Sequence, residues 1–142
     1  MNKKIFGFVI VLVIIVIGLS LNQNVEKRSN IVFHVTLANP DLYKNGIYSS
    51  TFVVDKGEYL FKFVSNGDSP QSLNILLKGD NYNFSENFKL EGTLHQTGIS
   101  EYYTWDYTGQ KVISISTSQN ITIEINPNGN ELGSVSVDII KN

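Results

Sequence analysis

The chain has 142 residues, 11 of them basic and 13 acidic, with a formal net charge of −2 and no cysteine. That length suits one domain, and the missing cysteines exclude a disulfide framework. Nucleic-acid binding would need a basic face, which this composition does not offer. If a domain of this size is exported, its lack of cysteine fits a prokaryotic cell surface better than a eukaryotic secretory route.

An uncharged, mostly apolar segment runs from residue 5 to residue 21, directly after Lys3 and Lys4. A basic end followed by an apolar run is typical of an export signal. The run reaches the lower limit for crossing a bilayer, about 17 residues. We therefore expect residues 1–21 to be a retained membrane anchor, single-pass, with the lysines inside and the remaining chain outside.

Two other fates of this segment stay open. A cut before Leu21, behind two small residues, would release a secreted domain. The pair Gly7-Phe8, after the two lysines, resembles the cut site of a type IV prepilin, which implies a subunit of a pilus-like or archaellum-like filament. Leu12 stands where that family carries a glutamate, so the resemblance is incomplete.

After a polar linker at residues 22–30, the chain alternates apolar and polar residues with a period of two, which predicts β-strands. Turn formers such as Asn, Gly and Pro separate the alternating runs. We expect strands at residues 31–37, 47–54, 58–65, 71–78, 88–94, 101–107, 111–117, 121–125 and 132–140. Eight or nine short strands predict that residues 31–142 form one all-β domain, an antiparallel β-sandwich or jelly roll.

The alternation also predicts which residues form the core. It is clearest in the last three expected strands, where isoleucine or valine alternates with Ser, Thr, Glu and Asp, so that one face is buried and the other wet. The expected core residues there are Ile113, Ile115, Ile121, Ile123, Ile125, Val135, Val137 and Ile139.

One strand carries a family resemblance. It reads Gly57-Glu58-Tyr59-Leu60-Phe61-Lys62-Phe63-Val64-Ser65-Asn66. This run resembles the central strand of Golgi-dynamics (GOLD) domains, which are small lumenal or extracellular β-sandwiches, and another apolar strand follows it here as in that family. The resemblance lies mainly in residues 57–77 and implies the fold. Lys62 stands where the transport-receptor members carry a cysteine, and those members end in a coiled coil and a C-terminal span, so the cargo-receptor role is not implied.

The sequence offers no convergent set of nucleophile, base and stabiliser, which an enzyme would need. His34 and His95 are the two histidines, and neither has a partner at a metal-ligand spacing. The segment 79–87 is rich in oxygen ligands but lacks the order of a calcium loop, so we interpret it as a solvated turn. We expect no catalysis, no cofactor and no metal.

The densest motif is aromatic. Tyr103, Trp105 and Tyr107 fall on one face of the expected strand. We interpret this face as core, because aromatic side chains bury large areas. The alternative is a glycan-contact platform, in which exposed rings stack on sugar faces while Glu101 or Asp106 accepts hydrogen bonds from hydroxyl groups.

Asn83 and Asn120 each begin an N-x-[ST] triplet. Both lie in or beside a predicted turn, where a glycan could be carried outside the cell. They are candidate N-glycosylation sites.

These patterns predict a membrane-anchored, extracytoplasmic β-sandwich with a binding or structural role at the cell surface. Its expected partners are the membrane, through residues 5–21, and a surface protein or glycan. The alternatives are the filament subunit and an accessory subunit of a membrane protein complex, whose helix would pack on the helices of its partner.

Overall fold

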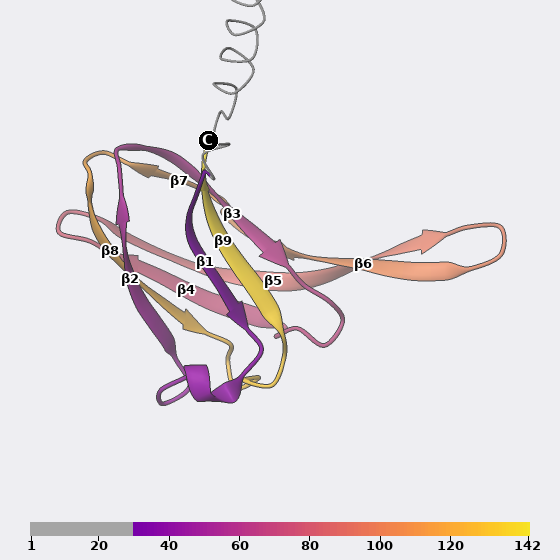
Figure 1. The fold of residues 1–142 in the computed structure, drawn as a ribbon. Coiled ribbons are helices and arrows are strands. Elements are labelled where there is room, and N and C mark those ends of the chain that lie inside the picture. The colour runs from indigo at the N-terminus through magenta and orange to yellow at the C-terminus, as the bar shows by residue number, and fades with distance from the viewer. Residues whose placement is uncertain (1–29) are drawn as a thin grey trace, which may run out of the picture.

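The computed structural model describes residues 30–142 (Figure 1). The expected anchor at residues 1–21, and the expected linker except for its last residue, lie outside the described residues. Within the described part of the chain, no helix is long and apolar enough to cross a membrane.

The described residues form two antiparallel sheets packed face to face, so the predicted all-β sandwich is confirmed (Figure 1). A 3-10 turn at Pro40–Leu42 joins the first two strands. The four-stranded sheet has the order β1 (Ile31–Leu37), β9 (Val135–Lys141), β3 (Gly57–Val64) and β7 (Val112–Ile115). The five-stranded sheet has the order β2 (Tyr48–Val54), β8 (Gln119–Asn126), β4 (Ser72–Lys78), β5 (Asn83–Gln96) and β6 (Glu101–Thr108).

The core lies between the two sheets, where the alternating apolar residues of both meet. Each of the eight core residues predicted from the last three strands is buried. Phe61 of β3 lies at the centre, with its ring centroid 5.3 Å from that of Phe88 and 5.7 Å from that of Phe84, both on β5. The aromatic run that carries the family resemblance therefore supplies the middle of the core.

β5 is the strand that differs most from its prediction. It begins at Asn83, so the predicted turn at residues 79–87 is wrong beyond Tyr82. The actual turn is short, with the Gly79 N–H donating to the Tyr82 carbonyl at 2.8 Å. The polar residues between Phe84 and Phe88 obscured the alternation. Because successive side chains of a strand point to opposite faces, the oxygen ligands of this segment do not converge on one ion.

β5 and β6 extend beyond the sandwich as a two-stranded hairpin, which we call the arm (residues 91–104; Figure 1). Their pairing is regular from Lys89 opposite Thr108 to Gln96 opposite Glu101. A turn closes the arm, in which the Thr97 N–H donates to the Ser100 carbonyl at 2.8 Å. The side chains of the arm are exposed apart from that of His95, which is partly buried, so strand pairing rather than a second sheet holds the arm together.

Candidate functional site

The predicted aromatic face of β6 leaves the core as the strand enters the arm. Tyr107 is 0% exposed, Trp105 is half-buried against the core, and Tyr103 is 55% exposed. The core interpretation therefore holds for Tyr107 and is wrong for Tyr103. Tyr107 is in turn unable to contact a glycan, because its ring has no free face.

Tyr107 is fixed by a buried hydrogen bond. Its hydroxyl donates to the Pro70 carbonyl at 2.5 Å, and its ring centroid lies 5.0 Å from that of Phe63. Burial raises the pKa of the Tyr107 hydroxyl well above its ordinary value of 10.0, and the nearby Tyr43 raises it further. The phenol is therefore neutral and ties β6 to the loop that precedes β4.

We expect Tyr107→Phe to lower the free energy of unfolding by about 1–3 kcal/mol, because the buried Pro70 carbonyl loses its donor. The pH dependence should change as well. The folded chain holds the Tyr107 proton more tightly than the unfolded chain does, so stability present below pH 10 is lost as the pH rises above it. Urea unfolding at about pH 8 and about pH 11 should show a smaller alkaline loss in the variant than in the parent chain. An equal loss in both chains would contradict this assignment.

Trp105, the chain's only tryptophan, lies at the base of the arm. Its indole packs over Gly92 on β5, where a Cβ atom would come within 2.7 Å of the ring, and it reaches Gly67 in the loop after β3. Its carbonyl accepts a hydrogen bond from Ser65 Oγ at 2.9 Å. Tyr103 stacks beside it, with ring centroids 5.8 Å apart. Of the predicted platform, these two rings are the part that remains accessible.

Gly92→Ala should displace the Trp105 indole, since the added methyl occupies the space against which the ring packs. The single tryptophan then reports the change directly, and we expect its fluorescence emission to shift toward that of water-exposed indole. Thr93→Ala, on the opposite face of the same strand, is the matched control and should leave the emission unchanged. An unshifted spectrum in Gly92→Ala would show that the ring does not depend on this glycine.

The opposite face of the arm carries a second aromatic group. The ring of Tyr102 is 52% exposed and stacks on His95, with centroids 5.0 Å apart and an interplanar angle of 15°. His95 Nε2 lies 2.8 Å from Thr104 Oγ1. These contacts link β5 to β6 across the arm, so Tyr102 is held in place while about half of its surface stays exposed. The predicted strand at residues 88–94 stops one residue short of His95, which lies within β5.

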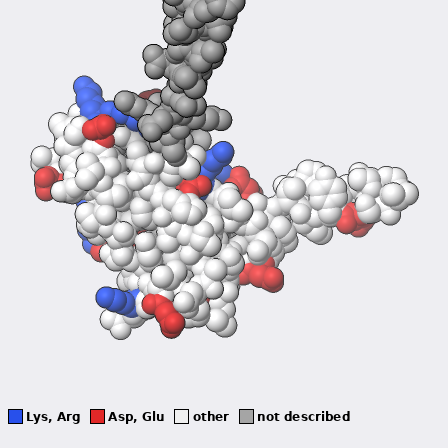
Figure 2. All heavy atoms as spheres, in the orientation of Figure 1, with Lys and Arg blue, Asp and Glu red and all other residues white. Residues whose placement is uncertain are grey.

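The arm lacks basic residues throughout. No lysine or arginine occurs between residues 90 and 110, and in Figure 2 the projecting arm is mostly white, with acidic groups on its edge. Ile99 at the tip is 99% exposed, and Leu94 is exposed on the same face as Tyr103. Apolar and aromatic side chains therefore lie on both faces and at the end of the arm.

His34 belongs to a polar row that the sequence did not reveal. On the outer face of the four-stranded sheet, His34 Nδ1 lies 2.5 Å from Asp138 Oδ1, and His34 Nε2 lies 3.4 Å from Thr36 Oγ1. Hydroxyl, imidazole and carboxylate in this order are the components of a nucleophile activated by a base. His34 and Thr36 are nevertheless exposed, while Asp138 is partly buried, and Thr36 Oγ1 is only 2.8 Å from Ser136 Oγ. We interpret it as a cross-strand link that holds the edge strand β1 to β9.

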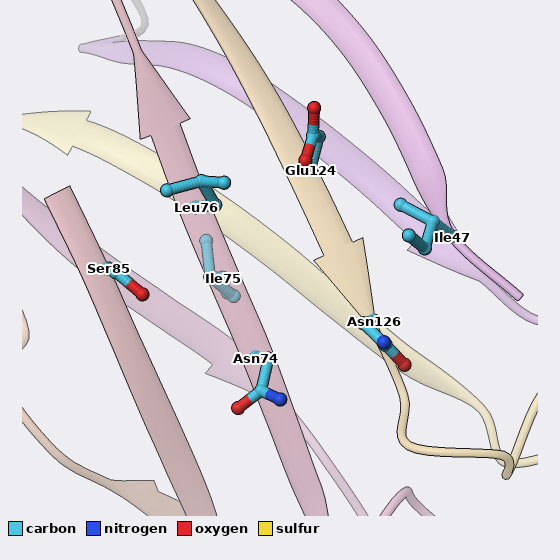
Figure 3. Close-up of a pocket in the computed structure, with 7 residues that line it drawn as sticks. All are labelled: Ile47, Asn74, Ile75, Leu76, Ser85, Glu124 and Asn126. Atoms are coloured by element: carbon cyan, nitrogen blue, oxygen red, sulfur yellow. The ribbon is translucent and has the colours of Figure 1, made fainter. Parts of the chain in front are cut away.

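A shallow hollow of about 330 Å³ lies on the five-stranded sheet (Figure 3). Several of its polar groups already have partners within the protein. Glu124 pairs with Lys78 at 3.1 Å, and Asn128 holds both Asn74 and Asn126 by hydrogen bonds. The residues that line the hollow are Ile47, Asn74, Ile75, Leu76, Ser85, Glu124 and Asn126. Because its amides and carboxylate are engaged, the hollow is a weaker candidate than the arm.

The remaining predicted positions are separate from the arm. Asn83 is the first residue of β5 and Asn120 the second of β8, and both side chains are exposed. Within residues 30–142, no group of three or more His, Asp or Glu side chains is arranged to hold a metal ion.

The candidate site is therefore the arm. A scan against protein-family models and searches of curated proteins and of solved structures gave no match to this chain.

Proposed function

We propose that the chain is a membrane-anchored, extracytoplasmic binding module that contacts a protein partner through the arm. In this proposal residues 1–21 form the anchor helix and the sandwich is displayed outside the cell. The observation that carries the binding role is the exposure of Tyr102, Tyr103 and Ile99 on a projection that lies outside the core. Large apolar side chains that stay exposed together on one projecting element indicate an interaction site.

The strand order supports treating the arm as an addition to the fold. The order β1-β9-β3-β7 opposite β2-β8-β4-β5 fits a jelly roll of eight strands, to which β6 adds a ninth at one edge. β5 is also the longest strand, at 14 residues, and only part of it faces the other sheet. A sandwich of this kind does not need the distal arm for its own core.

A protein partner fits the arm better than a glycan does. A sugar would stack on the ring pair Tyr103 and Trp105 and use one face of the hairpin. The arm instead exposes Leu94 and Tyr103 on one face, Tyr102 on the other and Ile99 at the tip. A protein surface can cover all three, and tyrosine and tryptophan are enriched in such interfaces.

Site-specific photo-crosslinking in intact cells tests this proposal. A photoreactive amino acid at Tyr103 of the full chain should give discrete protein adducts, whereas the same group at the exposed Ser49 on β2 should not. Externally added protease should also remove the domain from the same cells. A Tyr103 probe that yields no more adduct than the Ser49 probe would contradict the binding role of the arm.

The mass of the native N-terminus tests the anchor. A chain that starts at Met1 or Asn2 supports retention, a start at Phe8 supports the filament alternative, and a start at Leu21 gives a free secreted domain. This measurement is independent of the arm, because each form would display the same sandwich.

A hydrolase panel tests the absence of catalysis. The purified chain should show no turnover, because His34 and Thr36 lie on an open sheet face. If the chain turned over a substrate and His34→Ala abolished that turnover, the prediction of no catalysis would be wrong, and His34 would belong to an active site.

A further inference from the structure

We propose that the partner of the arm is the arm of a second copy of this chain, joined by antiparallel pairing of β6 with β6. This proposal rests on the proposed function and specifies its partner. Among the strands of residues 30–142, β6 is the outermost of the five-stranded sheet, so none of them pairs with its other edge. Such an edge is a template for another strand unless lysine, proline or a bulge blocks it. β6 contains neither residue, and its register with β5 is regular.

The free part of this edge has a defined end. The Trp105 carbonyl already accepts a hydrogen bond from Ser65, so the loop after β3 occupies the strand there. Towards the tip, the side-chain hydrogen bonds of residues 100–104 stay within the arm, as in the bond of Gln96 Nε2 to Glu101 Oε1 at 2.8 Å. The accessible stretch is therefore centred on Tyr102.

A two-fold axis through Tyr102 gives a pairing that suits the side chains. Directly opposite residues of an antiparallel pair share a face, so Tyr102 meets its own copy, Glu101 meets Tyr103, and Ser100 meets Thr104. Aromatic residues directly opposite one another stabilise a sheet, and no two carboxylates are opposite here. Because His95 already stacks on Tyr102, the outer face would carry a continuous row of four rings, two from each copy.

The lipid bilayer is a poorer partner for the free edge of β6 than another strand is. An unpaired strand edge cannot satisfy its N–H and C=O groups in lipid. A second copy of β6 supplies those hydrogen bonds and sets Tyr102 beside its own copy. The isologous pairing also closes on itself, so it predicts a dimer and not an open chain.

Cysteine trapping in the full chain, in its own membranes, tests the register. The parent chain has no cysteine, so each introduced thiol is unique. Under mild oxidation Tyr102→Cys should form a disulfide-linked dimer. Co-expressed Ser100→Cys and Thr104→Cys should form the mixed dimer, while each alone should form little, since its own copy lies far along the strand. Ser49→Cys is the control and should stay monomeric.

A failure of the Tyr102→Cys chain to dimerise, together with a monomeric parent chain, would overturn the pairing. Adducts from the Tyr103 photoprobe that contain only another protein would overturn it too, while leaving the binding role intact. Quenching of Trp105 fluorescence by brominated lipid would assign the arm to the bilayer instead.

A charged residue in place of Tyr102, on the proposed two-fold axis, provides a second test of the pairing. Tyr102→Lys places two like charges opposite each other and should weaken dimerisation by up to about fivefold. Tyr102→Phe keeps the ring and should dimerise as the parent does. Equal dimerisation of the lysine and phenylalanine variants would contradict the proposed axis.

Discussion

Replacing Phe61 with alanine is expected to lower the free energy of unfolding by about 3–5 kcal/mol. The Phe61 side chain is buried between the sheets, and its ring contacts Phe63, Phe84 and Phe88. Removal of the ring leaves a cavity that β3 and β5 cannot close without separating from their neighbours. Because a domain of this size is typically stable by only about 5–15 kcal/mol, the loss is a large fraction of the total.

Val64→Ala is the matched control for Phe61→Ala. Val64 lies on the same strand, but it is 67% exposed. Its truncation should change the free energy of unfolding by less than about 0.5 kcal/mol. Urea denaturation followed by circular dichroism measures both variants. Similar losses in the two would mean that Phe61 does not hold the centre of the core.

The same burial pattern explains why the sandwich could be predicted from the sequence. Along β8, Ile121, Ile123 and Ile125 alternate with polar residues and are all buried. Alternation of this kind fixes which face of a strand meets the core. It gives no information on the strand order or on which strand lies opposite.

Alternation of apolar and polar residues does not predict the arm. Tyr103 and Tyr107 have the same phase in the same strand, yet one is exposed and the other buried. The difference arises because β5 and β6 extend beyond the edge of the four-stranded sheet. How far they extend depends on the lengths of strands that are distant in sequence. The pairing of His34 with Asp138 is hidden for a related reason, since 104 positions separate them and only the register of β1 with β9 brings them together.

Replacing Gly109 with alanine is expected to lower the free energy of unfolding by about 2–4 kcal/mol. Gly109 follows β6, where the chain leaves the five-stranded sheet for β7 of the other sheet. Its φ of +146° is a conformation that residues with a side chain rarely adopt. An added Cβ would also come within 2.7 Å of the buried Phe88 ring. Backbone strain and overpacking of the core therefore act together at this position.

Gly98→Ala separates these effects from the general cost of replacing a glycine. Gly98 lies in the turn of the arm, and no atom beyond its chain neighbours lies within 4 Å of an added Cβ. Its substitution should alter the free energy of unfolding by no more than about 0.5 kcal/mol. Thermal and urea unfolding of both variants check the contrast. A large loss in Gly98→Ala would mean that the arm contributes to the stability of the sandwich, whereas a loss confined to Gly109→Ala is what a separable binding arm requires.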